Sequence, residues 1–101
     1  MDIVNAIAKV RFGSAKAQCV HLHQAGACRV ELICMEPGQK LRVSRGEWTY
    51  YVIIGTACLT SNDKPVEVPT GQLVVAGLKE VHTLSNPGER RLVCLAIWRT
   101  E

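Results

Sequence analysis

Residues 71–86 read GQLVVAGLKEVHTLSN, and this stretch decides the fold. Gly71 and Gly77 bound a short apolar run, Leu73 to Val75, which is typical of a strand between two turns. His82 then opens a second short run that ends at Asn86. The stretch therefore predicts two short strands separated by a glycine turn.

The same alternation of short apolar runs and turn residues continues along the chain. Further strands are predicted at 18–23, 29–35, 41–44, 48–54, 57–60, 66–68 and 91–98. Pro37-Gly38 is typical of a tight turn, and a turn-rich hairpin loop spans 61–65. The run from Trp48 to Ile54 is almost continuously aromatic or β-branched, so we expect a strand buried on both faces. This pattern indicates an all-β barrel or sandwich.

The N-terminal residues follow a different period. Ile3, Ile7 and Val10 share one helical face, and Asp2 is a candidate N-cap. One short helix is predicted here, ending near a breaker cluster at 12–14. We expect residues 1–17 to form a helix and lead-in, and residues 18–101 to form the barrel.

The spacing of Gly71, Gly77, His82 and Asn86 resembles the second half of the cupin signature, G(x)5PxG(x)2H(x)3N, with Gly77 in place of the family proline and Lys79 in place of the following glycine. The aromatic-aliphatic run that stops at Gly55 matches the strand that closes the first half. The resemblance extends from about residue 18 to the end and implies a small RmlC-like double-stranded β-helix, or jelly-roll, barrel.

The first half of the cupin signature is degenerate in this chain. In most cupins it supplies His-x-His and a glutamate, which bind a divalent metal with the later histidine. Counting along this sequence places the two histidine equivalents at Arg42 and Ser44, or at Ser44 and Gly46, and the glutamate at Trp48 or Glu47. No register yields a histidine, and Arg42 would repel a cation, so we expect neither a family-type metal nor another cofactor.

A divalent metal, if bound, has two candidate ligand sets. One is His82 with Glu47. The other is His21 with His23, which lie two residues apart on a predicted strand and so share a face about 7 Å apart. An exposed polar face is the preferred interpretation of the second pair, and Cys28 is a further candidate ligand beside it.

The positions implied by the resemblance suggest a ligand pocket inside the barrel. An inward guanidinium at Arg42 requires an anionic partner, either Glu47 or a ligand. The predicted ligand-binding residues are Arg42, Ser44, Glu47, Trp48, Tyr50 and His82. The predicted function is binding of a small anionic molecule without a family-type metal.

Two other function classes stay open. His82 could act as acid or base in a His-based or metal-dependent enzyme of isomerase or oxygenase type. The barrel could instead be a structural or regulatory module. Several strands look apolar on both faces and small cupins commonly pair through their sheets, so we also expect a homodimer.

Composition restricts the environment and the partners. The 101 residues carry a formal net charge of +3 with scattered basic residues, so nucleic acid is not an expected partner. No apolar run approaches the roughly 20 residues that span a bilayer, so no membrane partner is expected. Five cysteines without a C-x-x-C pair favour reduced thiols, although Cys19 and Cys28 flank a turn and could approach each other. We predict a cytoplasmic protein.

Overall fold

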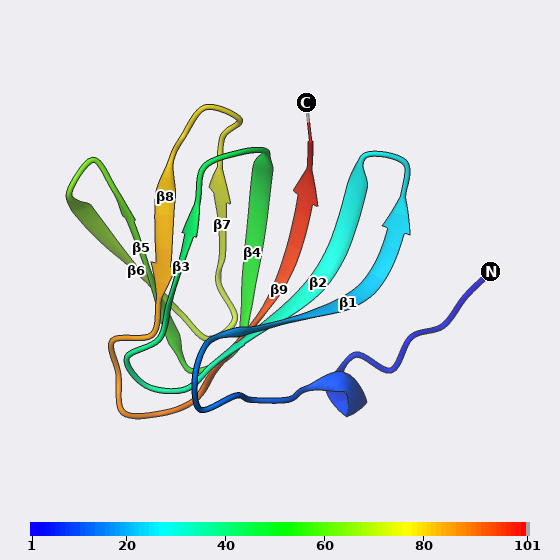
Figure 1. Cartoon of the computed structure of the whole chain (residues 1–101), viewed down its shortest axis with the longest axis horizontal. Helices are drawn as coiled ribbons and strands as arrows, with labels where there is room; N and C mark the ends of the chain where they lie inside the picture. The colour runs from blue at the N-terminus through cyan, green and yellow to red at the C-terminus, as the bar shows by residue number, and fades with distance from the viewer. Residues whose placement is uncertain (101) are drawn as a thin grey trace.

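The computed structural model describes residues 1–100, and it is built almost entirely of β-strands (Figure 1). A single 3-10 turn, η1, covers Ile7–Lys9. The strands are β1 (Gln18–Ala25), β2 (Cys28–Met35), β3 (Lys40–Val43), β4 (Glu47–Ile54), β5 (Thr56–Ser61), β6 (Lys64–Pro69), β7 (Leu73–Ala76), β8 (His82–Ser85) and β9 (Leu92–Arg99). The all-β prediction is confirmed.

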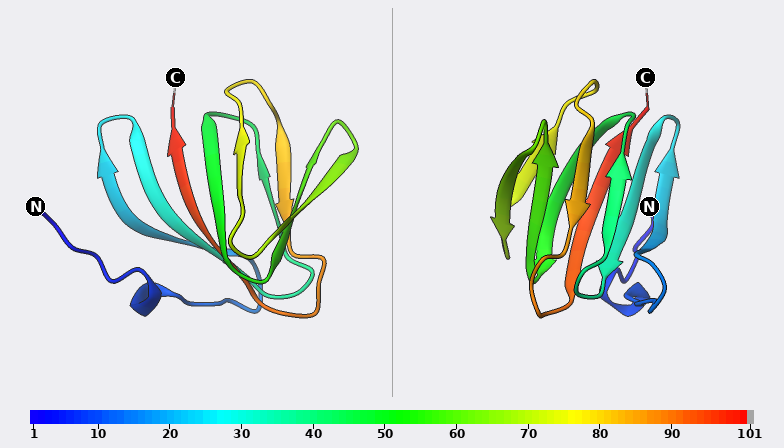
Figure 2. Two further views of the ribbon diagram at one scale, coloured as in Figure 1. Left: turned by 180° about the vertical axis from the view of Figure 1, so that it is seen from behind. Right: turned by 60° about the vertical axis from the view of Figure 1, so that its left-hand side comes forward.

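The strands form two antiparallel sheets that face each other. The five-stranded sheet has the order β1-β2-β9-β4-β7, and the four-stranded sheet has the order β3-β8-β5-β6. Figure 2 shows the two sheets as the walls of a barrel that is open at one end, where the β1–β2 hairpin splays away from the four-stranded sheet. Strand β4 passes into β5 through Gly55, so the chain moves from one sheet to the other at that residue.

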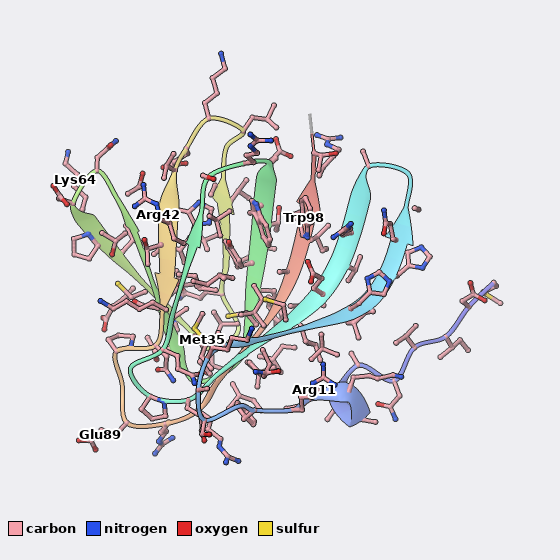
Figure 3. The ribbon with its side chains drawn as sticks, viewed as in Figure 1. Arg11, Met35, Arg42, Lys64, Glu89 and Trp98 are labelled. Carbon is pink, nitrogen blue, oxygen red and sulfur yellow. The ribbon has the colours of Figure 1, made fainter. Side chains whose placement is uncertain are left out.

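Side chains from the inner faces of both sheets fill the barrel. The core consists of Ile33, Met35, Val43, Trp48, Tyr50, Val52, Ala57, Leu59, Val68, Ala76, Leu84, Leu92, Cys94 and Ala96. Figure 3 shows Met35 between the two walls. Because these side chains come from strands of both sheets, their burial holds the walls together.

A second, smaller cluster lies on the outer face of the five-stranded sheet. Val20, Leu32, Cys34 and Val93 are buried there, and Ala6, Val10 and Phe12 of the N-terminal segment pack over them. Strand β2 is therefore covered on both faces, and its outer cover comes from the chain's own lead-in. The predicted helix is a single 3-10 turn that begins after Ala6, so Asp2 does not cap it.

Strand β4 does not follow its prediction of burial on both faces. Trp48, Tyr50 and Val52 point into the barrel, whereas Tyr51 and Ile54 on the outer face are 41% and 48% exposed. The apolar run of β4 therefore supplies both the core and an exposed apolar outer face. Within residues 1–100, no helix has the length and apolar character needed to cross a membrane.

Candidate functional site

His82 and Tyr50 form a buried polar pair inside the barrel. His82 opens β8 with an exposed fraction of 3%, and Tyr50 on β4 is fully buried. Tyr50 Oη and His82 Nε2 are 2.6 Å apart, and His82 Nδ1 lies 3.1 Å from the carbonyl oxygen of Glu80. Since a carbonyl can only accept, Nδ1 carries the hydrogen and Nε2 accepts from the tyrosine hydroxyl. Burial, above all, raises the pKa of Tyr50, which keeps it a donor.

An aromatic stack extends from this pair towards the open end of the barrel. The rings of Trp48 and Tyr50 stack with centroids 5.6 Å apart, and the rings of Trp48 and Trp98 stack at 4.9 Å with an interplanar angle of 8°. Arg29 lies over the ring of Trp98, with its guanidinium carbon 5.0 Å from the ring centroid. Trp98 Nε1 donates to Glu31 Oε1 over 2.5 Å. Figure 3 labels Trp98 on β9 at this end. Two of the predicted ligand residues, Trp48 and Tyr50, are therefore part of this stack.

Arg42 is not inside the barrel, so its predicted orientation is wrong. Arg42 is exposed, and its neighbour Val43 is buried and pairs with His82. Side chains alternate along a strand, which places Arg42 on the outer face of the four-stranded sheet beside Thr83. Figure 3 labels Arg42 on this sheet.

Ser44 and Glu47 also lie away from the barrel interior. Ser44 follows β3 and is exposed. Glu47 pairs with Arg99 across the sheet, and its Oε1 lies 3.3 Å from Arg99 Nη2. Trp48 and Tyr50 are the predicted ligand residues that do face inward with His82. Their role in ligand binding stays a prediction.

The candidate metal ligands are not brought together. Both ring nitrogens of His82 are engaged, and Glu47 is engaged with Arg99 on the opposite side of β4 from Trp48. His21 pairs with Glu31 and His23 pairs with Val30, because a bulge interrupts β1 between them. Adjacent residues of β2 face opposite ways, so the two histidines do not share a face. These side chains do not fit a divalent metal in this arrangement.

Arg42 and His82 nevertheless line one hollow, at the rim of the four-stranded sheet. The hollow has a volume of about 280 Å³ and is lined by Arg42, Thr60, Asn62, Asp63, Val81, His82 and Thr83. Arg42, Thr83 and Thr60 come from β3, β8 and β5 and lie in one cross-strand row. Among the described residues, the guanidinium of Arg42 makes no ion pair.

The other polar side chains of this hollow come from the β5–β6 turn. Asn62 and Asp63 form a two-residue loop with φ values of 52° and 61°. Two consecutive left-handed residues are typical of a type I′ hairpin turn, and asparagine and aspartate tolerate that conformation. The sequence predicts a hairpin loop for this segment and no binding role. Its polar pair beside two β-strand threonines was the signal that could have located the hollow.

A larger hollow of about 470 Å³ lies at the closed end of the barrel, among the loops that hold Gly55, Thr70 and Asn86. Asn86 is buried and fully used there, since its amide donates to the carbonyl oxygens of Met35 and Arg90 and its carbonyl accepts from Gly88 N. Asn86 therefore holds the turn.

The arrangement of strands matches known structures, although the sequence does not match known families. No family model and no curated protein matches this chain. The protein TT1209 from Thermus thermophilus superimposes with a TM-score of 0.92 at 16% identity, over 99% of this chain and 98% of its own. An RmlC-like cupin protein from Desulfovibrio desulfuricans gives 0.84 at 20% identity, over 98% and 96%.

The chain has the cupin fold. The predicted resemblance to small RmlC-like cupins is thus confirmed at the level of the fold. A third cupin-fold match is a putative sugar phosphate isomerase from Acidithiobacillus ferrooxidans, with a TM-score of 0.63 and 28% identity, over 74% of this chain and 51% of that chain. Sequence identity this low supports a shared fold but not a shared activity.

Proposed function

We propose that this cupin-fold protein binds a small hydroxylated anion, such as a sugar phosphate or sugar acid, in the hollow around Arg42. The observation that carries the proposal is the position of the Arg42 guanidinium, which makes no ion pair among the described residues and lines a hollow whose other side chains are mainly hydroxyl, amide and carboxylate groups. A guanidinium binds phosphate or carboxylate through paired hydrogen bonds.

The remaining lining residues suit the hydroxyl groups of such a ligand. Thr60 and Thr83 can donate or accept, and Asn62 offers both an amide donor and a carbonyl acceptor. Asp63 accepts hydrogens from ligand hydroxyls but repels an anionic group, so the anion belongs at the Arg42 end. A volume of about 280 Å³ is near the lower limit of small-molecule sites, which suits a molecule of monosaccharide size.

The buried pair favours binding over acid–base chemistry. His82 contributes to the wall of the hollow, but its two ring nitrogens are occupied by Tyr50 and by the carbonyl of Glu80. A histidine-based reaction would have to break the 2.6 Å hydrogen bond to Tyr50 first. The structural match described as a putative sugar phosphate isomerase supports the class of ligand, and this chain would use its barrel rim to bind it.

Calorimetric titration with a panel of hexose phosphates, sugar acids and the matching neutral hexoses tests the proposal. We expect measurable binding of one or more phosphates, and a loss of about tenfold to a hundredfold in affinity in Arg42→Ala. Lys40→Ala is the matched control, since Lys40 is also an exposed cation of β3 on the same face but does not line the hollow.

The two variants distinguish a specific site from general attraction of anions. Binding that is lost in Arg42→Ala and kept in Lys40→Ala supports the site. Equal losses in both variants would indicate unspecific attraction of anions to β3, and no binding of any phosphate or sugar acid would overturn the proposal. Because Arg42 is exposed, we expect both variants to fold as the parent protein does.

A further inference from the structure

The hollow around Arg42 is lined by two opposite charges that do not pair with each other. Arg42 contributes to it from β3, and Asp63 contributes from the β5–β6 turn. Among residues 1–100, neither the guanidinium of Arg42 nor the carboxylate of Asp63 belongs to an ion pair. A ligand that fills the hollow therefore meets a cation at one end and an anion at the other.

The order of the strands keeps the two charges apart. The sheet runs β3-β8-β5-β6, so β8 and β5 lie between Arg42 and the turn that holds Asp63. Thr83 and Thr60 occupy the next two positions of the cross-strand row that begins at Arg42. Neighbouring strands lie about 4.8 Å apart, so roughly 10 Å separates the Cα atoms of Arg42 and Thr60. A ligand that reaches both charges must carry its own charges well apart.

The turn fixes the position of Asp63. Asn62 and Asp63 form the whole of a two-residue turn, and both have left-handed φ values, which leaves the backbone little freedom. Ser61, the last residue of β5, donates from its hydroxyl to the carbonyl oxygen of Val81 over 3.0 Å. This bond ties the turn to the loop that leads into β8. The backbone of Asp63 is therefore held at the turn end of the hollow.

Lys64, which follows Asp63 directly, contributes to a different hollow. Figure 3 labels Lys64 at the tip of the β5–β6 hairpin. Its side chain lines a small hollow with Leu59 and Val66, which are cross-strand partners on the barrel side of the sheet. Of the described residues that line the first hollow, Arg42 is the only lysine or arginine. The carboxylate of Asp63 is thus available to a cationic group of a ligand.

We propose that this hollow binds an amino sugar phosphate, with the phosphate on Arg42 and the ammonium group on Asp63; this assignment rests on the function proposed above. A carboxylate attracts a ligand cation and repels a second anion, so a ligand with one charge of each sign suits both ends. The sugar hydroxyls then face Thr60, Thr83 and Asn62 between the charges. An α-amino acid carries its ammonium and carboxylate on the same carbon, so it is too short to reach both ends.

Calorimetric titration with glucosamine 6-phosphate and glucose 6-phosphate measures the contribution of the ammonium group, because the two ligands differ only by an amine in place of a hydroxyl. At about pH 6.5, where the amine is protonated, we expect glucosamine 6-phosphate to bind about fivefold to tenfold more tightly. N-acetylglucosamine 6-phosphate, whose nitrogen is uncharged, should not show this gain. Serine, a short zwitterion, should bind more weakly than either hexose phosphate.

Asp63→Asn tests the carboxylate itself. Asparagine has nearly the same size and tolerates the left-handed backbone of this turn, so we expect the variant to fold. It should keep or increase the affinity for glucose 6-phosphate, because a repelling charge is removed, and it should reduce the ratio of the two affinities to about one.

Glu67→Gln is the matched control. Glu67 is an exposed acid of β6 that pairs with Cys58, on the same outer face as Thr60, but it does not line the hollow. This variant should therefore keep the preference of the parent protein for the amine.

The results distinguish a wrong ligand class from a wrong site. Binding of neither hexose phosphate would overturn the function proposed above and the amino sugar class together. Equal affinities for glucose 6-phosphate and glucosamine 6-phosphate would support the function proposed above and overturn the amino sugar class alone. A preference for the amine that persists in Asp63→Asn, or that Glu67→Gln removes equally, would overturn the role of Asp63. Serine bound as tightly as glucosamine 6-phosphate would overturn the assigned spacing of the two charges.

Discussion

The hydroxyl group of Tyr50 lies 2.6 Å from Nε2 of His82 in the interior of the barrel, where Tyr50 is fully buried and His82 is 3% exposed. His82 belongs to the stretch that identified the fold, and Tyr50 belongs to the strand that precedes Gly55. The two halves of the sequence resemblance therefore meet in one hydrogen bond. The position that holds a metal ligand in many cupins is occupied here by a histidine with both nitrogens engaged.

Removing the hydroxyl of Tyr50 tests the strength of this bond. In Tyr50→Phe, Nε2 of His82 remains buried without a donor, so the free energy of unfolding should fall by about 1–3 kcal/mol. Urea denaturation of the parent and the variant measures this change. In a His82→Leu background the acceptor is absent, and the same substitution should cost little or even stabilise. Equal costs in the two backgrounds would contradict the assigned bond.

The buried acids of the core predict a loss of stability at high pH. Burial raises the pKa of the Cys94 thiol to about 12, and it also raises the pKa of Tyr50. The folded chain therefore holds these protons more tightly than the unfolded chain, whose groups titrate near 9.0 and 10.0.

The contribution of Cys94 and Tyr50 is therefore fully present below pH 9 and decreases as the pH rises from 9 towards 12. Urea midpoints between about pH 7 and pH 11 should be flat at first and then fall. Cys94→Ala and Tyr50→Phe should each reduce the decrease of the urea midpoint at high pH, whatever their effect on the midpoint at neutral pH. A profile that neither variant alters would show that other groups cause the alkaline loss.

The fold could be predicted because its signals are local. Short apolar runs, each ended by glycine, proline or a polar pair, specify strands and turns one at a time, and the signature around His82 supplied their order. Trp48 and Tyr50 face inward, as expected of residues predicted to lie inside the barrel. Each of these features depends only on residues that are neighbours in the sequence, so one sequence is enough to predict it.

The candidate site could not be placed because it depends on register. Strand β3 has four residues, and a shift of one residue exchanges Arg42 for Val43 on its inner face. Counting from Gly38 or Gly55 crosses loops of unknown length, so neither count fixes that register. His21 and His23 were misplaced for a related reason, because the bulge between them changes the face of His23.

The cysteines offer a test of the burial pattern that does not depend on stability. All five thiols are free, with Cys19 exposed, Cys28 and Cys58 half-buried, and Cys34 and Cys94 buried. In the native protein we expect iodoacetamide to label Cys19 first and to leave Cys34 and Cys94 unlabelled, since a buried protonated thiol is a poor nucleophile. Mass spectrometry of digested protein gives the order, and labelling in urea should reach every cysteine. Rapid native labelling of Cys94 would contradict its place in the core.

Gly55, where the chain passes from one sheet to the other, should tolerate no side chain. It has a φ of 87°, and a Cβ there would lie 2.6 Å from the carbonyl oxygen of Arg91. Gly71 is a close control, because its φ is 85° but a Cβ would meet nothing within 4 Å.

Both alanine variants should lose about 1 kcal/mol from the left-handed backbone, and Gly55→Ala should lose a further 1–3 kcal/mol or so from the steric clash. Thermal or urea denaturation of the two variants measures the difference, to which only the contact with Arg91 and its neighbour contributes. Equal losses would mean that the β8–β9 loop yields to the added methyl group, and that the corner between β4 and β5 is set by backbone conformation alone.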